Sequence, residues 1–279
     1  MRAVTRPRGV TLIECLVSMV VSGALTAAAY GLLLTGSRLA RAESSALDVR
    51  RNVRAAAGVL RAELEGASTD AGDLLAISDS ALTLRAQRGL GVVCAPPGAS
   101  SLVLDDSLLS LLRAIDPTKD IALVYADGDP RTSADDHWLH AAVTWVRRGA
   151  CANGTAGTML SLGGATIAAD LADVGTGAPV RLVEVLEYRR YRDAAGLWWL
   201  GVRGPAAGGG WTASSPIAGP LRPRNGLTFR YTDTLGLTTA TPSAVATVEV
   251  AVHGVAAKAH APGLVRDDSL TARIAVRRP

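Results

Sequence analysis

The stretch RGVTLIECLVSMVV, residues 8–21, is apolar except for Arg8 and one carboxylate, Glu14, near its start. The apolar run continues to Thr35 without another charged side chain. About twenty consecutive apolar residues are enough to cross a bilayer as a helix. A carboxylate inside such a span costs several kcal/mol unless a partner neutralises it. The stretch therefore predicts a membrane-spanning helix with one charged side chain, whose presence there requires a functional explanation.

Three arginines precede the apolar run, and no acidic residue offsets them. Without Arg2, Arg6 and Arg8, the formal net charge of +4 falls to about +1. By the positive-inside rule, basic residues before a span hold that end in the cytoplasm, so the rest of the chain is exported. The remaining charges are mixed in sign and form no basic stripe with interleaved aromatics, which argues against nucleic-acid binding.

Two common kinds of segment fit this pattern incompletely. A cleavable secretory signal has a shorter apolar region with small residues after it, whereas here Ala27-Ala28-Ala29 lies inside the apolar run. A plain signal anchor has the right length, but it leaves Glu14 without a role.

Residues 9–14 resemble the type III signal of type IV pilins and type II secretion pseudopilins. In that family a short basic leader ends in Gly, and the fifth residue after the Gly is Glu. Gly9 matches the Gly, Val10 the new N-terminus and Glu14 the fifth residue, although Phe or Met is usual at the position of Val10. The resemblance implies that a prepilin peptidase cuts after Gly9 on the cytoplasmic side and N-methylates Val10.

The same resemblance implies a role for Glu14. Cleavage creates a positive α-amino group at Val10, and in a filament Glu14 can pair with the amine of a neighbour or of its own chain. A buried carboxylate that is paired is tolerable, and one left alone is costly. The alternative is a tolerated polar residue near the membrane surface.

A helical pattern continues beyond the span to about Gly66, and no proline occurs between Val10 and Ser68. Apolar residues recur at spacings of three and four among charged ones, which predicts one apolar stripe. We expect a helix roughly 85 Å long. Residues 10–36 would lie in the membrane and residues 37–68 on a globular domain, with a coiled-coil stalk as the alternative. The stripe consists of Leu39, Ala42, Ala46, Val49, Val53, Ala56, Leu60 and Leu64.

From about Asp70 the pattern changes to short alternating runs broken by turn residues, which predicts β-strands. The segment 193–196 predicts a hairpin turn, Leu108–Ala114 a short helix, and Gly204–Pro223 a long loop. In 246–252 the valines share one face, as in a half-buried strand. The expected strands are Ala81–Arg85, Ile121–Ala126, Ala141–Arg147, Met159–Leu162, Val180–Arg192, Leu197–Val202, Leu227–Thr232, Val245–His253 and Ser269–Val276.

The order of parts resembles the large minor pilins of the W type and the J-type minor pseudopilins. The supporting segments are Glu187-Tyr188-Arg189, Leu197-Trp198-Trp199, the run 226–231 and a last strand ending in Arg277-Arg278. The resemblance implies an α+β, pilin-like fold, in which a long N-terminal helix packs on a β-rich antiparallel domain. Residues 1–9 would be the cleaved leader, and residues 69–279 the domain exported to the periplasm.

Three cysteines occur in the chain. Cys15 would be a small apolar filler within the span. Cys94 and Cys151 fall in the exported domain, where an oxidising compartment favours their pairing. Such a bond would stabilise the fold by roughly 4 kcal/mol in a model-dependent entropy argument. The alternative is two free buried thiols.

Two polar segments have the composition of metal sites but not their spacing. His137 and His140 would share a face on a helix, yet this pair lacks further ligands and fits solvated loop residues better. Asp127 and Asp129 flank a glycine, as a β-turn requires, and the spacing of a calcium loop is missing. The sequence has no nucleophile elbow and no phosphate-binding glycine loop. It therefore predicts no enzyme, no cofactor and no metal.

These features together predict a membrane-inserted minor pilin or pseudopilin at the tip or in the initiation of a type IV pilus or type II secretion pseudopilus. The resemblance implies major and minor pilins or pseudopilins, a prepilin peptidase, an inner-membrane assembly platform and, before assembly, membrane lipid as partners. The alternative is a single-pass anchored adhesin or binding ectodomain that never polymerises.

Overall fold

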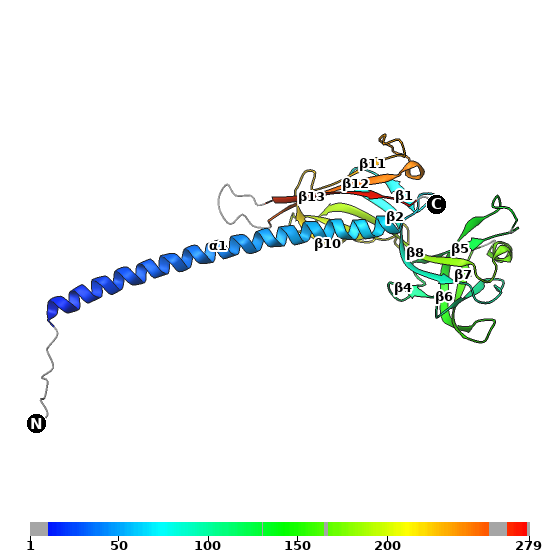
Figure 1. Cartoon of the computed structure of the whole chain (residues 1–279), viewed down its shortest axis with the longest axis horizontal. Helices are drawn as coiled ribbons and strands as arrows, with labels where there is room; N and C mark the ends of the chain where they lie inside the picture. The colour runs from blue at the N-terminus through cyan, green and yellow to red at the C-terminus, as the bar shows by residue number, and fades with distance from the viewer. Residues whose placement is uncertain (1–10, 130, 165–166, 257–266, 278–279) are drawn as a thin grey trace, which may run out of the picture.

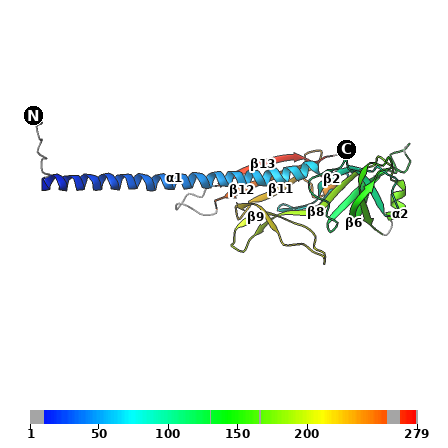
Figure 2. The same ribbon diagram turned by 90° about the horizontal axis from the view of Figure 1, so that it is seen from below.

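A computed structural model describes residues 11–129, 131–164, 167–256 and 267–277. One very long helix, α1 (Leu12–Gly66), leads into a domain built almost entirely of antiparallel strands (Figure 1). Only the C-terminal part of the helix meets this domain, and the rest projects from it (Figures 1 and 2). The predicted α+β fold, with a long N-terminal helix and a β-rich antiparallel domain, is confirmed.

Helix α1 begins after Thr11, which serves as its N-cap, and runs unbroken for 55 residues. At 1.5 Å per residue its length is about 82 Å. The glycines of its first half do not interrupt it, and a Cβ at Gly23, Gly31 or Gly36 would meet nothing within 4 Å. The helix ends at Gly66, and the N–H of its C-cap residue, Ala67, donates to Leu64 O.

The strands form one sheet. A short helix α2 (Ile167–Asp170) and two 3-10 turns, η1 (Leu171–Asp173) and η2 (Pro242–Ala244), are the other elements of the described domain. The strands are β1 (Leu74–Ile77), β2 (Ala81–Val92), β3 (Ser101–Asp105), β4 (Ser110–Leu111), β5 (Asp120–Ala126), β6 (His137–Ala150), β7 (Ala156–Gly163), β8 (Pro179–Arg192), β9 (Trp198–Arg203), β10 (Ser215–Leu221), β11 (Leu227–Thr232), β12 (Thr247–Val255) and β13 (Asp267–Ala275).

Strand β8 links the two ends of the sheet. Its first half pairs with β5 and its last residues pair with β9, while β2 runs along most of its length. The path of paired strands is β11-β12-β10-β9-β8-β5-β6-β7-β3, with β13 on β12 and β1 and β4 on β2. The sheet therefore has an α1-proximal end, around β9 to β13, and an α1-distal end, around β3 to β7 (Figure 1).

Each end of the sheet has its own hydrophobic core. The first core lies between α1 and the sheet and includes Leu60, Leu64 and Val250, all fully buried. The second core lies among β3, β5, β6, β7 and the α2 turn, and no residue of α1 belongs to it. We call the two parts the helix lobe and the distal lobe.

The apolar stripe of α1 buries itself on the helix lobe only from Val49 onward. Val49, Val53 and Leu60 are 4%, 1% and 0% exposed, and Val53 and Val49 lie against Gly254 of β12. The prediction that residues 37–48 also lie on the domain is wrong for Leu39, which is 58% exposed. The reason is geometric, because the N-terminal part of the helix projects beyond the sheet (Figure 2).

All nine expected strands are present, and four others were not predicted. In β12 the alternation is as expected, with Val248, Val250 and Val252 fully buried. The turn at 193–196 joins β8 to β9, and Gly196 adopts the positive φ of 83° that such a turn needs.

Two local predictions are wrong. Leu108–Ala114 is not a helix; Ser110 and Leu111 form β4, which pairs with Gly89 and Leu90 of β2. Asp105 accepts hydrogen bonds from the N–H and hydroxyl of Ser107, and this local turn competes with helix formation.

Gly204–Pro223 is not a continuous loop, because Ser215–Leu221 forms β10 against β9. Prolines are excluded from regular central strands, and this pairing accommodates them with irregularities after Pro216 and Ala218. The high Pro and Gly content of the segment therefore concealed a strand.

Candidate processing and assembly segment

The cleavage and methylation residues expected from the sequence, Gly9 and Val10, lie outside the described residues. The structure describes the chain from Thr11 onward. The geometry of the segment is therefore that of the helix immediately after the expected cut, with Glu14 in its first turn.

Glu14 closes a capping box with Thr11. The Thr11 N–H and hydroxyl donate to Glu14 Oε2 at 2.9 and 3.0 Å, and the Glu14 N–H donates to Thr11 Oγ1 at 3.3 Å. Such reciprocal bonds satisfy backbone donors that a helix leaves free at its start. The sequence contained this signal, a Thr followed three residues later by Glu, and the sequence analysis missed it.

Both oxygens of a carboxylate can accept, and only Glu14 Oε2 has a recorded partner in the described residues. The partners it has are neutral, so its negative charge has no cation within the described part of its own chain. A carboxylate of this kind in a membrane or a protein interior calls for a positive group.

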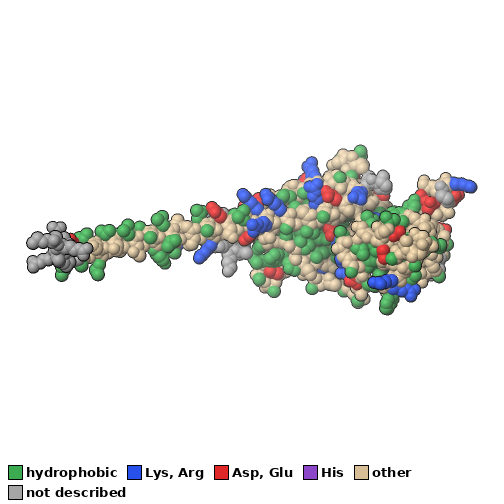
Figure 3. Space-filling model, turned by 60° about the horizontal axis from the view of Figure 1, so that its bottom comes forward, with side chains coloured by type: hydrophobic (Ala, Val, Ile, Leu, Met, Phe, Trp, Pro, Cys, Tyr) green, Lys and Arg blue, Asp and Glu red, His purple; other side chains and the backbone are tan. Residues whose placement is uncertain are grey.

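The rest of the first half of α1 is apolar and uncovered. Residues 11–36 are all exposed, with Leu12, Met19 and Leu32 at 82%, 77% and 75%. On the face that Figure 3 shows, hydrophobic side chains line this part of the helix, whereas charged ones gather where it nears the domain. By length and composition, α1 is the one described helix able to cross a membrane.

Hydroxyl groups within the apolar half bond to the helix itself. Thr26 Oγ1 donates to Ser22 O at 2.8 Å, and Thr35 Oγ1 donates to Gly31 O at 2.9 Å. These bonds satisfy the hydroxyl donors without water, as a lipid or protein environment requires.

The C-terminal end of α1 contrasts with its beginning, because the carboxylate of Glu63 is paired with a cation of the same chain. Arg88 donates to Glu63 at 3.1 and 3.3 Å and to Glu184 at 3.2 Å, and the Tyr188 hydroxyl donates to Glu63 at 2.9 Å. Arg113 and Lys119 also bind Glu184, at 2.8 and 3.2 Å.

Burial raises the pKa of Glu184, but the hydrogen bonds from its three cations outweigh burial and leave that pKa below its ordinary value. Burial and the neighbouring Glu63 raise the pKa of Tyr188, which stays protonated as a donor. This network joins the docked C-terminal end of α1 to β2 and β8.

Residues 5–30 match one family model. Its description is the prokaryotic N-terminal methylation motif. No curated protein and no solved structure matched the chain. The methylation motif is the type IV pilin-like signal and supports a processed subunit of the pilin or pseudopilin kind. Together with the apolar start of α1, it fits a membrane-anchored, single-pass protein.

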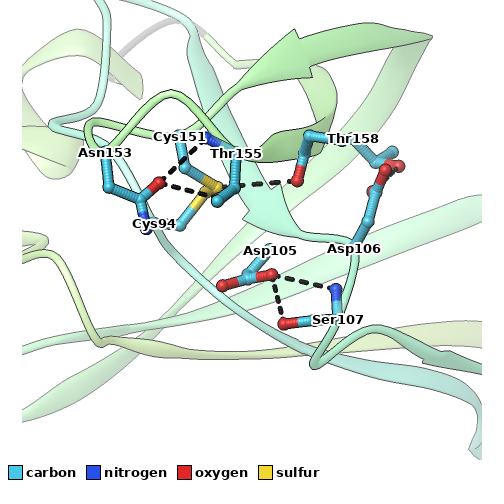
Figure 4. The surroundings of a disulfide bond; sticks show 9 residues. Cys94, Asp105, Asp106, Ser107, Cys151, Asn153, Thr155 and Thr158 are labelled. Atoms are coloured by element: carbon cyan, nitrogen blue, oxygen red, sulfur yellow. Dashed lines mark hydrogen bonds between the residues drawn. A yellow bond between two sulfur atoms is a disulfide. The ribbon is translucent and has the colours of Figure 1, made fainter.

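The structure joins Cys94 and Cys151, which are 57 residues apart in the chain (Figure 4). Cys94 follows β2 and Cys151 follows β6, so the bond lies in the distal lobe. Ala152 N–H donates to Cys94 O at 3.1 Å beside the bond, and Asn153 organises the adjacent turn through Thr155. The third cysteine, Cys15, is an exposed residue of the apolar half of α1.

His137 and His140 are exposed, as expected, but they lie on a strand and not in a loop. Both lie on strand β6, where a spacing of three residues places side chains on opposite faces. Burial, together with the nearby Arg85, lowers the pKa of His140. Asp127 and Asp129 lie in an acidic loop, where burial and then Asp136 raise the pKa of Asp127. In the part of the chain that the structure describes, no group of three or more His, Cys, Asp or Glu is arranged to hold a metal.

Proposed function

We propose that this protein is a minor pilin or pseudopilin: a precursor cut after Gly9, N-methylated on Val10 and assembled into a type IV pilus or a type II secretion pseudopilus. The proposal includes a leader of residues 1–9, a membrane half of residues 10–36 and an exported domain of residues 69–279. No residue of the chain is assigned a catalytic role.

One observation carries this proposal. A helix with the methylation motif at its start is apolar and exposed on all sides for its first half, and its one carboxylate, Glu14, has neutral partners. Lipid can cover the apolar surface, but it offers no cation at that depth. The new α-amino group at Val10, from the same or a neighbouring subunit, would supply that cation and set the register of assembly.

A place at the tip or in initiation is supported by the bulk of the exported domain. The distal lobe lies beyond the end of α1 and has a separate core. A subunit with this extension is easiest to accommodate where fewer neighbours surround it. Major and minor subunits, a prepilin peptidase and an inner-membrane assembly platform would be its partners, and lipid would cover the helix before assembly.

The test is the N-terminal mass of the protein extracted from membranes, after expression with and without an active prepilin peptidase. We expect a chain that starts at N-methylated Val10 with the peptidase and at the initiating residue without it. Gly9→Val should block processing, whereas Gly23→Ala should not, because a Cβ at Gly23 meets no other atom within 4 Å. An unprocessed chain in the presence of a peptidase that cuts a control pilin would refute the proposal.

A further inference from the structure

The outer surface of the helix lobe has aromatic side chains that belong to neither core. Trp198 packs against the first core, so its neighbour Trp199 points to the opposite face of β9. Tyr191 of β8 pairs directly with Trp199 and lies on the same face. Both rings are partly exposed, and neither is a member of the first or the second core.

Each of these rings lies against a glycine of the sheet. A Cβ at Gly201 would overlap Tyr191 Cε1, and a Cβ at Gly219 would lie 2.7 Å from Trp199 Cε3. Both glycines are buried. The rings are therefore seated close to the backbone, in a region where β9 extends away from the line of α1 (Figure 2).

Further along the same face lies a third aromatic ring. Four residues beyond Trp199, Arg203 donates to Glu187, its pairing partner on β8. The Arg203 guanidinium lies 5.0 Å from the centre of the Trp211 ring, which is 38% exposed. The row from Trp199 to Arg203 is about 13 Å long at the usual rise of a strand.

Polar groups of both signs lie between and beside the rings. Arg189 pairs with Gly201 in the middle of the row, and its side chain is 36% exposed. Its Nε is buried without a hydrogen-bond partner among the described residues, and its Nη1 lies 3.8 Å from Glu187. The Trp199 indole N–H donates to Asp193 Oδ2 at 2.8 Å. Arg189 and Arg203 are balanced by Glu187 and Asp193, so this surface has no excess of positive charge to attract a polyanion.

Flat rings with balanced polar neighbours suit a ligand that is uncharged, has apolar C–H faces and has many hydroxyl groups. A β-1,4-linked hexopyranose chain has this chemistry, because its equatorial linkages make an extended ribbon with C–H groups on its broad faces. The stated row of about 13 Å would seat roughly two to three such sugars. The seated rings would lose little conformational entropy on binding.

We propose that the outer face of β8, β9 and β10 is a binding site for an uncharged β-1,4-linked glycan. Sugar rings lie on Trp199, Tyr191 and Trp211, and Arg189 and Asp193 hydrogen-bond their hydroxyls. The site goes beyond assembly of the proposed filament and does not depend on processing at Gly9.

The test is titration of the full chain in detergent micelles with cellohexaose and, separately, with chitohexaose, followed by tryptophan fluorescence and calorimetry. We expect saturable binding of at least one probe. Binding of chitohexaose alone would assign the site to N-acetylated glycans, and binding of cellohexaose to unsubstituted ones. Trp199→Ala should weaken binding at least about tenfold.

Trp145→Ala is the matched control, because Trp145 is 70% exposed on β6 of the distal lobe and should be irrelevant. Should Trp199→Ala unfold the protein, Trp211→Ala provides the same test, since Trp211 lies outside both cores. Failure of both probes to saturate up to about 10 mM would overturn the proposal. Wild-type affinity for the glycan in a folded Trp199→Ala or Trp211→Ala variant would also overturn the proposal. So would binding to oligodeoxythymidine that is tighter than binding to either glycan and weakens with added salt.

Discussion

The two halves of α1 belong to one unbroken helix, yet they have opposite surroundings. Between residues 12 and 36 every side chain is exposed, while Val53, Leu60 and Leu64 in the second half are at most 1% exposed. Tertiary contacts stabilise the helical conformation of the second half, because it buries an apolar stripe on the sheet. The first half has no such contacts in the described chain, and its length and apolar composition fit a membrane-spanning segment.

The glutamates of the two halves differ in the same way. Glu63 is bound by Arg88 and Tyr188 of its own chain, whereas Thr11 is the only partner of Glu14 among the described residues. A carboxylate that is paired within its own chain contributes to the stability of the fold. A carboxylate that has only neutral partners instead favours association with a group that supplies a positive charge. The comparison separates Glu63, which is bound within the domain, from Glu14, for which we propose a role in assembly.

The largest expected effect follows from removing the unpaired charge. Glu14→Ala should lower incorporation into filaments by more than about tenfold, because the proposed pairing of Glu14 with the Val10 amine would be lost. Membrane insertion and the unfolding of the exported domain should not change. Incorporation is measured by immunoblot of sheared filaments against membrane-retained protein.

Glu43→Ala is the matched control for this variant, since Glu43 is an exposed glutamate of the same helix outside the apolar run. Normal incorporation of Glu14→Ala would refute the assigned role of Glu14. A loss of insertion as well as assembly would instead make Glu14 part of the membrane signal.

The next effect concerns the distal lobe, which receives no residue from α1. Cys94→Ala with Cys151→Ala should reduce the free energy of unfolding by about 4 kcal/mol, because a long loop is no longer closed in the unfolded chain. The measurement is urea unfolding of the full chain in micelles, with and without reductant. Cys15→Ala is the control and should have no effect, and an equal loss in that variant would contradict the assignment to the Cys94–Cys151 bond.

The sequence predicted what periodicity controls and missed what tertiary pairing controls. The stripe through Val53 and Leu60 and the alternation in β12 were both evident from spacing. Strand β3 was not, because its apolar centre, Leu102–Leu104, is buried on both faces and shows no alternation.

The electrostatic network was also beyond prediction from spacing. Arg88 meets Glu63 across 25 residues and Glu184 across 96 residues, and only the folded sheet brings them together. The processing motif that includes Glu14 was predictable because its residues are adjacent in the sequence. The contacts of aromatic rings with Gly201 and Gly219 were not, because the register of β8, β9 and β10 had to be known.

A smaller effect tests the docked half of the helix directly. Leu60→Ala should destabilise the domain by about 3 kcal/mol, because it leaves a cavity in the first core. Leu47→Ala is the matched control, since Leu47 is 50% exposed on the same helix and should change stability by less than about 0.5 kcal/mol. Equal effects of the two substitutions in urea unfolding would show that α1 does not dock as described.

The smallest effect is a pH dependence of the ionic network that joins α1 to β2 and β8. The pKa of Glu184 lies below its ordinary value of 4.5 because its hydrogen bonds to cations outweigh burial, so the folded protein binds this proton less readily than the unfolded chain. The contribution of Glu184 to the stability of the fold is therefore fully present above pH 4.5 and is lost as the pH falls through the lowered pKa of the folded state.

Glu184→Gln tests this contribution. The substitution should reduce the free energy of unfolding by about 1–2 kcal/mol at neutral pH, since Arg88 keeps Glu63 and Arg113 keeps Asp120 as partners. The variant should also lose stability less steeply on acidification below pH 4.5 than the wild type, as measured by urea unfolding at a series of pH values. Parallel pH profiles would mean that other carboxylates, rather than this network, control the acid sensitivity of the domain.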